Sequence, residues 1–130
     1  RDTLKRPAMG EVAGRHSDLS IVTSDNPRTE NPAKIITDIE VGIQRICPRL
    51  EPAGRIETLD KGYIVIEDRH DAIVYAVNQL RQGDLLLIAG KGHEDYQVIG
   101  TQKIHFDDRE QVRMALEQRA RQESSHETDQ

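Results

Sequence analysis

Apolar residues recur with the period of an α-helix in several segments of the chain. The most regular pattern follows Asn31 and Pro32, a pair typical of a helix start, and consists of isoleucines that recur up to the next proline. Residues 6–16 predict a shorter helix near the beginning of the chain. Further helices are expected after the capping residues Asp68 and Asp107.

Shorter apolar runs between these helices predict β-strands. Residues 19–22 and 63–66 form such runs next to turn-forming residues, and residues 56–59 are a candidate for a short strand. The run at 85–89 is continuously apolar, a pattern typical of a strand that is buried on both faces in a parallel sheet. Residues 96–106 predict a hairpin, because a glycine turn separates two strand-like runs.

Strands that alternate with helices indicate right-handed crossover connections between parallel strands. We therefore expect an α/β fold, a Rossmann-like three-layer sheet with mostly parallel strands and an antiparallel edge hairpin. A length of 130 residues is within the range of one domain, and residues 1–121 are assigned to it. Residues 122–130 contain no apolar side chain and predict a disordered polar tail.

Composition restricts the partners that the chain can bind. Acidic residues outnumber basic ones, 23 against 18, and the aromatic side chains are three tyrosines and one phenylalanine. Nucleic acid is therefore disfavoured, because phosphate binding needs a basic surface and base stacking needs aromatic rings. No apolar run is long enough to cross a bilayer and the chain start lacks a secretion signal, so we expect a cytoplasmic protein without a membrane partner.

Two polar loops follow predicted strands and carry the side chains with the clearest binding chemistry. In the first loop, Arg28 presents a planar guanidinium that matches a carboxylate. In the second loop, Gly90 permits a close approach of the backbone, and Glu94 can accept hydrogen bonds from an ammonium group. Because ligands gather at the carboxyl ends of parallel strands, the two loops together predict a receptor for a zwitterion.

Other interpretations of these loops stay open. Taken alone, the first loop is also typical of a helix lead-in with a surface arginine. The Gly-Lys-Gly segment around Lys91 suggests a phosphate-binding loop, but it lacks the spacing of that motif and the Ser or Thr that follows its lysine. His93 is a candidate general base, although no partner stands beside it at a recognisable spacing, and a positioning role is favoured. The histidine and cysteine spacings indicate no metal site.

Several short segments of the chain stand in an order that is specific to one family. They are Arg1-Asp2, Lys5-Arg6-Pro7, Met9-Gly10, Val22-Thr23, Asp25-Asn26-Pro27-Arg28-Thr29-Glu30 and Ala89-Gly90-Lys91-Gly92-His93-Glu94-Asp95-Tyr96-Gln97. In these segments the chain resembles the Mur ligases, and the resemblance extends over residues 1–119.

The resemblance implies which residues bind the substrate. In the branch of the family that adds meso-diaminopimelate, the Asp-Asn-Pro-Arg segment recognises the incoming amino acid. Arg28 and Arg1 would then bind the carboxylates of diaminopimelate. The free amino acid lysine lacks the distal carboxylate, so its binding would leave Arg28 unpaired. Glu94 and the carbonyl group of Gly90 would bind the ammonium group at the distal stereocentre. The implied diaminopimelate-binding residues are Arg1, Asp25, Asn26, Pro27, Arg28, Gly90 and Glu94.

The resemblance also implies an enzyme, an ATP-dependent ligase that joins meso-diaminopimelate to UDP-N-acetylmuramoyl-L-alanyl-D-glutamate in peptidoglycan synthesis. ATP and Mg²⁺ would bind mainly outside this chain, which has no phosphate-binding loop, and no catalytic or metal-binding residue is expected within it. We expect the chain to lack the first strand of its domain, to be monomeric and to be inactive alone. The alternatives are a lysine-adding ligase of the same family and a non-catalytic module that binds amino acids.

Overall fold

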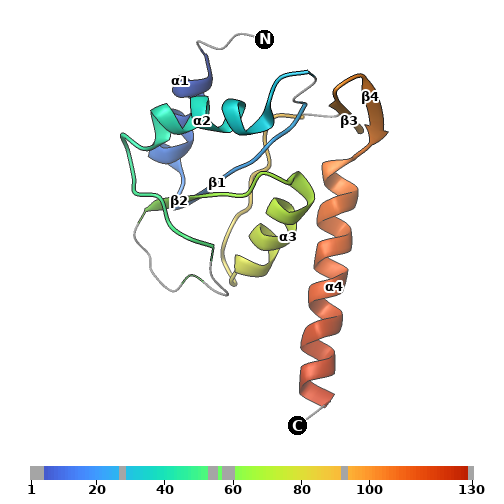
Figure 1. Cartoon of the computed structure of the whole chain (residues 1–130). Coiled ribbons are helices and arrows are strands. Elements are labelled where there is room, and N and C mark those ends of the chain that lie inside the picture. Colours follow the sequence, from blue (N-terminus) through green and yellow to red (C-terminus); the bar gives the residue numbers. More distant parts are fainter. Residues whose placement is uncertain (1–4, 27–28, 53–55, 57–60, 92–93, 129–130) are drawn as a thin grey trace.

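The chain folds into helices that flank two small β-sheets (Figure 1). The computed structural model describes residues 5–26, 29–52, 56, 61–91 and 94–128, with side chains described up to residue 125. The elements in chain order are α1 (Lys5–His16), β1 (Leu19–Val22), α2 (Pro32–Ile43), β2 (Gly62–Val65), α3 (Arg69–Gln79), β3 (Tyr96–Ile99), β4 (Gln102–His105) and α4 (Asp108–Thr128).

The parallel sheet consists of β1 and β2, which pair from Leu19 opposite Gly62 to Val22 opposite Val65. The connection between them contains α2, as the alternating pattern predicted. Apolar residues from these elements form the first part of the core, between the sheet and α2. Its buried members are Val22, Ile36, Ile43, Cys47 and Tyr63.

Helices α1 and α2 cross at a very short distance, because glycines stand at the contact. A Cβ atom on Gly42 would overlap the carbonyl group of Pro7, and one on Gly10 would overlap the carbonyl group of Ile39. Backbone therefore packs directly on backbone at this crossing. The contact holds α1 against the helix that follows the first loop.

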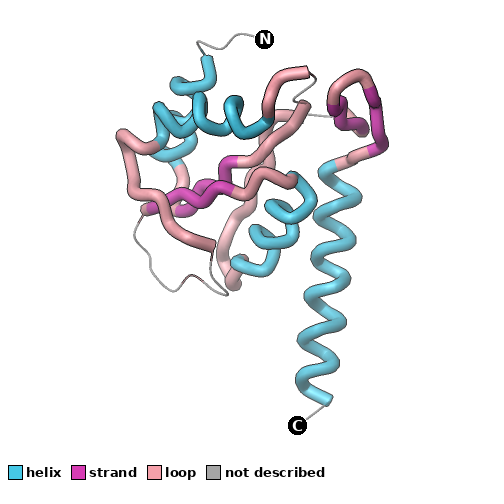
Figure 2. Tube along the Cα trace, in the orientation of Figure 1, coloured by secondary structure: helices cyan, strands magenta, loops and turns pink. Residues whose placement is uncertain are grey.

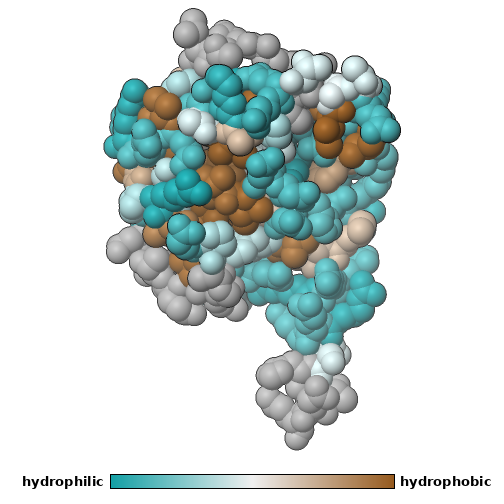
Figure 3. All heavy atoms as spheres, viewed as in Figure 1, coloured by the Kyte–Doolittle hydropathy of each residue, from teal (hydrophilic) through white to brown (hydrophobic). Residues whose placement is uncertain are grey.

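The second part of the core lies between α3 and α4. Ile73 and Val77 of α3 pack with Phe106 and with Ala115 of α4, and Leu86 and Ile88 join them from the segment after α3. Helix α4 then extends well beyond the rest of the molecule (Figures 1 and 2). In the space-filling view its described extension is covered by hydrophilic residues (Figure 3).

Most of the predicted elements are confirmed with small shifts of their ends. Asn31 caps α2 by accepting a hydrogen bond from the amide of Ala33, and Asp68 caps α3 by accepting one from the amide of Asp71. The predicted hairpin is the antiparallel pair of β3 and β4, which turns at Gly100 with a φ of 62°. The strand predicted at 56–59 lies outside the described residues, apart from Ile56.

The prediction of a doubly buried strand at 85–89 is wrong for this chain. Residues 85–89 are not assigned to a strand, and the side chains of Leu85 and Leu87 are 93% and 84% exposed. Leu86 and Ile88 face the other way and pack against the second part of the core. The segment thus has one packed side and one exposed side, and no strand pairs with it among the described residues. The described residues form two-stranded sheets in place of the large sheet expected from the sequence.

The end of the chain also differs from expectation. Helix α4 continues to Thr128, where the sequence predicted a disordered tail from Gln122 onward. Glutamate, glutamine and arginine are good helix formers, and Arg119 forms an ion pair with Glu123 one turn later, at 3.1 Å. A polar composition therefore does not prevent an exposed continuation of a helix whose earlier turns are packed. No helix within the described ranges is long and apolar enough to cross a membrane.

The close helix crossing generates a stability prediction. Gly42→Ala should lower the free energy of unfolding by about 2 kcal/mol or more, because the new methyl group meets a backbone carbonyl that cannot move aside. Chemical denaturation measures this effect. Gly14→Ala is the matched control, since its Cβ would meet only side-chain atoms of Ile43 and Ile46, at 3.0 and 3.1 Å, which can shift. Equal stability of the two variants would contradict the prediction.

Candidate functional site

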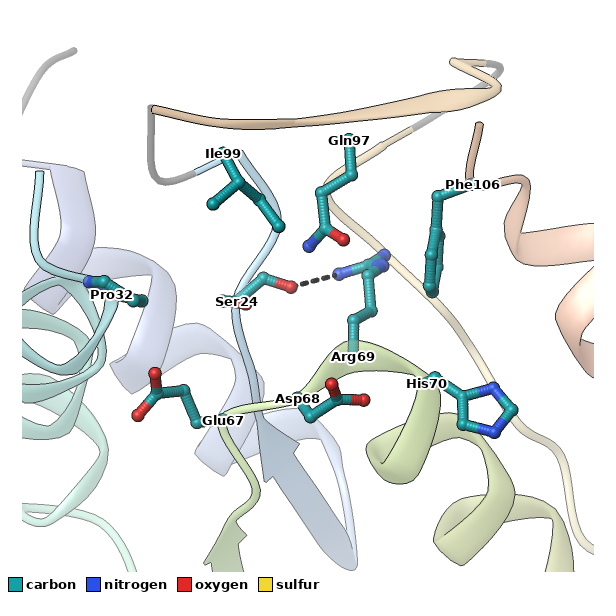
Figure 4. Close-up of a pocket in the computed structure, with 9 residues that line it drawn as sticks. All are labelled: Ser24, Pro32, Glu67, Asp68, Arg69, His70, Gln97, Ile99 and Phe106. Carbon is teal, nitrogen blue, oxygen red and sulfur yellow. Dashed lines mark hydrogen bonds between the residues drawn. The ribbon is translucent and has the colours of Figure 1, made fainter. Parts of the chain in front are cut away.

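The two polar loops predicted from the sequence lie next to each other, and Arg69 at the start of α3 connects them. Its guanidinium donates a hydrogen bond of 3.2 Å to the carbonyl oxygen of Ser24, at the start of the first loop (Figure 4). It donates another of 3.2 Å to the carbonyl oxygen of Ala89, just before the second loop. The carboxyl ends of β1 and of the segment after α3 are thereby joined through one side chain.

Arg69 is also paired with an acidic residue at the start of α4. Its Nε and Nη2 atoms bind the two oxygens of Asp108 at 2.8 and 2.7 Å, which is the two-point geometry preferred between guanidinium and carboxylate. Only 4% of Arg69 is exposed. A buried charge is stable only when it is paired and hydrogen-bonded, and the described contacts of Arg69 meet that condition.

A pocket of about 330 Å³ opens beside Arg69 (Figure 4). Charged groups from the start of α3 line one part of it, and apolar groups from the hairpin and from α2 line another. Its lining residues are Ser24, Pro32, Glu67, Asp68, Arg69, His70, Gln97, Ile99 and Phe106. The pocket thus borders the first loop and the β3 strand that holds it.

Asp25 in the first loop pairs with Lys91 in the second. The Nζ atom of Lys91 lies 2.8 Å from Oδ1 of Asp25, and the lysine side chain has no exposed surface. Lys91 also donates to the carbonyl oxygen of Tyr96 and lies 5.6 Å from the centre of the Phe106 ring. The contact with Asp25 is an ion pair without the alignment of a hydrogen bond, since Oδ1 has no hydrogen-bond partner among the described residues.

The first loop is held from the hairpin as well. Gln97 of β3 donates a hydrogen bond of 2.7 Å to the carbonyl oxygen of Asp25. The next residue of the loop, Asn26, accepts a hydrogen bond of 2.9 Å from the amide of Val98 through its side-chain oxygen. Its side-chain nitrogen lies 3.4 Å from a carboxylate oxygen of Glu94 and donates to it. Asn26 therefore links the hairpin to the second loop.

Gly90 stands where the second loop approaches the first. Its φ of 113° is a conformation that side chains with a Cβ rarely adopt. A Cβ built at this position would lie 3.7 Å from Oδ2 of Asp25. The backbone of the second loop consequently passes close to the Asp25 carboxylate, and Gly90 allows its course.

The fold brings together the predicted site residues that the structure describes. Asp25 and Asn26 contact the second loop directly, through Lys91 and Glu94, and Gly90 faces Asp25. The remaining site residues Arg1, Pro27 and Arg28 lie outside the described residues, as do Gly92 and His93. Their assignment to the site stays a prediction.

Sequence reasoning did not identify the residues that hold the loops in place. Lys91 was recognised only as part of a glycine-rich segment, and neither Gln97 nor Arg69 was assigned a role. Arg69 follows the predicted cap of a helix, a place where a solvent-exposed arginine is common. Only its burial distinguishes it, and burial is a property of the folded chain.

Arg6 of α1 is a second buried arginine that sequence reasoning missed as an anchor. It donates to both carboxylate oxygens of Glu30, at 2.8 and 2.9 Å, and to Asp38 of α2 at 3.0 Å. These hydrogen bonds lower the pKa of the Glu30 and Asp38 carboxyl groups from their usual values. Since Glu30 follows the first loop closely in sequence, Arg6 anchors the point at which the chain leaves that loop.

No group of three or more metal-binding side chains gathers within the part of the chain that the structure describes. The described site instead offers carboxylate and amide oxygens beside buried cations. Such a set can accept hydrogen bonds from an ammonium group. These groups can bind a ligand and orient it.

Comparisons with known proteins place these features in one family. The family described as Mur ligase, glutamate ligase domain, matches residues 1–92. The UDP-N-acetylmuramoyl-L-alanyl-D-glutamate--2,6-diaminopimelate ligase of Geobacter metallireducens is 57% identical over 118 residues, which cover 89% of this chain and 23% of that protein. The ligase of the same name from Gloeobacter violaceus is 52% identical over 119 residues, which cover 92% of this chain and 22% of that protein.

A solved structure agrees with the sequence matches. The structure titled "Structure of UDP-N-acetylmuramoyl-L-alanyl-D-glutamate--2, 6-diaminopimelate ligase" superposes with a TM-score of 0.75 at 38% sequence identity. The superposed part covers 92% of this chain and 22% of the chain in the solved structure. The chain therefore spans only about a fifth of the length of the relatives that it matches.

The Lys91 pair generates a prediction about how the loops are held. Lys91→Met should lower the free energy of unfolding by about 1–3 kcal/mol, because it leaves the Asp25 carboxylate partly buried without its cation. Adding Asp25→Asn should restore part of the loss, since the uncompensated charge is then removed. Denaturation of the single and double variants measures the coupling between the two residues.

The control for this experiment is Lys34→Met. Lys34 also faces a carboxylate, that of Asp38 at 3.4 Å, but 64% of its side chain is exposed. An exposed pair of this kind contributes at most about 1 kcal/mol. If the effects of Lys91→Met and Asp25→Asn simply add, the ion pair does not hold the loops together.

Proposed function

The chain belongs to the Mur ligase family, and on that premise we propose that it carries the amino-acid recognition site of an ATP-dependent ligase. The proposed reaction joins meso-diaminopimelate to UDP-N-acetylmuramoyl-L-alanyl-D-glutamate, a step of peptidoglycan synthesis. The relatives that match most of this chain carry the name of that reaction. Because they are several times longer, the complete protein is needed for activity.

The observation that carries the proposal is the contact between the two loops. Asn26 and Glu94 are separated by 68 positions in sequence, and the side-chain nitrogen of Asn26 lies 3.4 Å from Oε1 of Glu94. Gly90 stands close to Asp25 in the same place. A carboxylate that is held between the two loops suits the ammonium group of an amino acid.

The residues then have complementary roles in binding diaminopimelate. Arg28 and Arg1 bind its carboxylates, because a guanidinium matches a carboxylate at two points. Glu94 and the carbonyl group of Gly90 bind the ammonium group at the distal stereocentre, which does not react. Asp25, Asn26 and Pro27 complete the recognition segment and shape the loop that presents Arg28.

The chemical step takes place largely beyond the residues of this chain. ATP with Mg²⁺ would convert the carboxylate of the muramoyl dipeptide into an acyl phosphate and release ADP. The reacting amine of the bound diaminopimelate would then displace phosphate and form the new peptide bond. The chain contributes the orientation of the bound amino acid, which reduces the entropic cost of the bimolecular step. We further propose that the complete protein acts as a monomer in the cytoplasm.

A larger sheet is the second part of the proposal. Leu85 and Leu87 are exposed on one side of an extended segment whose other side is packed. We propose that in the complete protein a strand that precedes Arg1 pairs with residues 85–89 and extends the sheet. The domain then has the three layers of a Rossmann-like fold.

Arg28 provides the sharpest test of the substrate. In the full-length protein, Arg28→Ala should raise the KM for meso-diaminopimelate at least about tenfold and leave the KM for ATP nearly unchanged, because one carboxylate of the substrate loses its partner. Steady-state ligation assays measure both constants. Arg15→Ala is the control, since Arg15 is an exposed arginine that pairs only with Glu11 among the described contacts.

The same assay separates the competing functions. The wild-type protein should ligate diaminopimelate in strong preference to lysine. A preference for lysine would assign the protein to the lysine-adding branch, and ATP-independent amino-acid binding without ligation would indicate a binding module. Equal changes of the KM for diaminopimelate and of the KM for ATP in Arg28→Ala would contradict the assignment of Arg28 to the amino-acid site.

The proposed strand pairing has its own test. Amide hydrogen exchange at residues 85–89 should be at least about tenfold slower in the full-length protein than in this chain alone, because paired strand amides are protected. The β3–β4 hairpin is the internal control, since its pairing is present in this chain. Equally fast exchange at 85–89 in both proteins would contradict the extended sheet.

A further inference from the structure

The carboxylate of Glu94 is held at both of its oxygen atoms. Oε1 accepts the hydrogen bond from the side-chain nitrogen of Asn26, at 3.4 Å. Oε2 accepts a hydrogen bond of 3.1 Å from the hydroxyl group of Tyr96. One donor comes from the first loop and the other from the beginning of β3, so the two hydrogen bonds restrain the carboxylate from different parts of the fold.

The donor from Asn26 has a defined direction. The side-chain oxygen of Asn26 accepts from the backbone amide of Val98 at 2.9 Å, and a backbone amide can only donate. The oxygen of the Asn26 amide group must therefore face Val98, which turns the nitrogen toward Glu94. The orientation of this amide follows from its hydrogen bonds.

The donor from Tyr96 is supported across the hairpin. Lys103 of β4 places its Nζ atom 4.0 Å from the centre of the Tyr96 ring. Tyr96 is opposite His105 in the register, so Lys103 is its diagonal neighbour on the same face of the hairpin. A cation over the ring face stabilises the position of the ring, and the ring position sets the direction of the hydroxyl group.

A carboxylate at the end of a flexible side chain rotates broadly about its last bond. Two donors that bind different oxygens restrict this rotation, and each carboxylate oxygen has a second lone pair that can accept a hydrogen bond from a ligand. An acceptor that is fixed before the ligand arrives binds more tightly, because less freedom is lost on binding.

We propose that Tyr96 is a positioning residue, which orients Glu94 to receive the ammonium group of the amino-acid substrate. The inference rests on the proposed function, because it takes Glu94 as the group that binds the substrate. Tyr96 touches no reacting atom in this scheme. It acts only through the Glu94 carboxylate.

The test is Tyr96→Phe in the full-length protein, which removes one hydroxyl group and keeps the ring beneath Lys103. The KM for meso-diaminopimelate should rise about three- to tenfold, because Glu94 keeps the Asn26 donor and loses the other. The kcat and the KM for ATP should change by less than about twofold. Thermal unfolding measured on the same samples shows that the variant is folded.

Tyr63→Phe is the matched control. The Tyr63 hydroxyl group also donates to a glutamate, Glu40 at 2.8 Å, but it lies in the first part of the core. Burial and the Glu40 hydrogen bond raise the pKa of Tyr63 to about 12. This variant should lose stability and leave the KM for diaminopimelate unchanged, which separates a structural effect from positioning.

A double variant tests whether Tyr96 acts through Glu94. In a Glu94→Ala background, which removes the acceptor of the Tyr96 hydroxyl group, adding Tyr96→Phe should change kcat/KM for diaminopimelate by less than about twofold. An undiminished effect in that background, an unchanged KM in the single variant, or equal increases for diaminopimelate and ATP would each overturn the proposal. Failure of the wild-type protein to ligate diaminopimelate would instead refute the proposed function.

Discussion

A single buried guanidinium, that of Arg69, donates hydrogen bonds to the carbonyl groups of Ser24 and Ala89 and to the carboxylate of Asp108. These three partners stand at the start of the first loop, before the second loop and at the start of α4. The guanidinium supplies five donors in a rigid plane, so it can bind several chain segments at set angles. This contact joins the two loops, and the hydrogen bonds from Gln97 and Val98 of β3 hold the first loop as well.

Once the loops are adjacent, their own residues complete the arrangement. Lys91 reaches Asp25 from within the core, and Asn26 bridges the amide of Val98 and the carboxylate of Glu94. Much of the hydrogen-bonding capacity of Asp25 and Asn26 is thus directed into the protein. The described residues of the Asp-Asn-Pro-Arg segment therefore hold the first loop in place. Such preorganisation lowers the entropic cost of binding.

The wrong prediction of a doubly buried strand at 85–89 rests on the pattern of apolar residues, as the confirmed predictions of helices and strands do. A continuous apolar run indicates that both faces of a strand are covered, and this run meets the core with Leu86 and Ile88 only. Leu85 and Leu87 are exposed because no neighbouring strand lies beside them among the described residues. The proposed pairing with a further strand in a longer protein would cover the exposed side of the segment, and the chain spans about a fifth of the length of its relatives. At residues 85–89 the apolar pattern of the sequence therefore does not match the exposure of the side chains.

The sequence alone determined the helices, the first parallel strands, the hairpin and the family, because period, capping residues and motif order are local properties of the chain. It also predicted the site residues, which are Arg1, Asp25, Asn26, Pro27, Arg28, Gly90 and Glu94. Only the tertiary structure decided that Arg69 and Lys91 hold the two loops, because each binds partners that are distant in sequence. It also decided that the hydroxyl group of Tyr96 meets Glu94, because no spacing in the sequence encodes the direction of a side chain. An arginine after a helix cap and a lysine between glycines look like surface residues in sequence. Burial gives them their roles, and burial is decided by the packing of the whole chain.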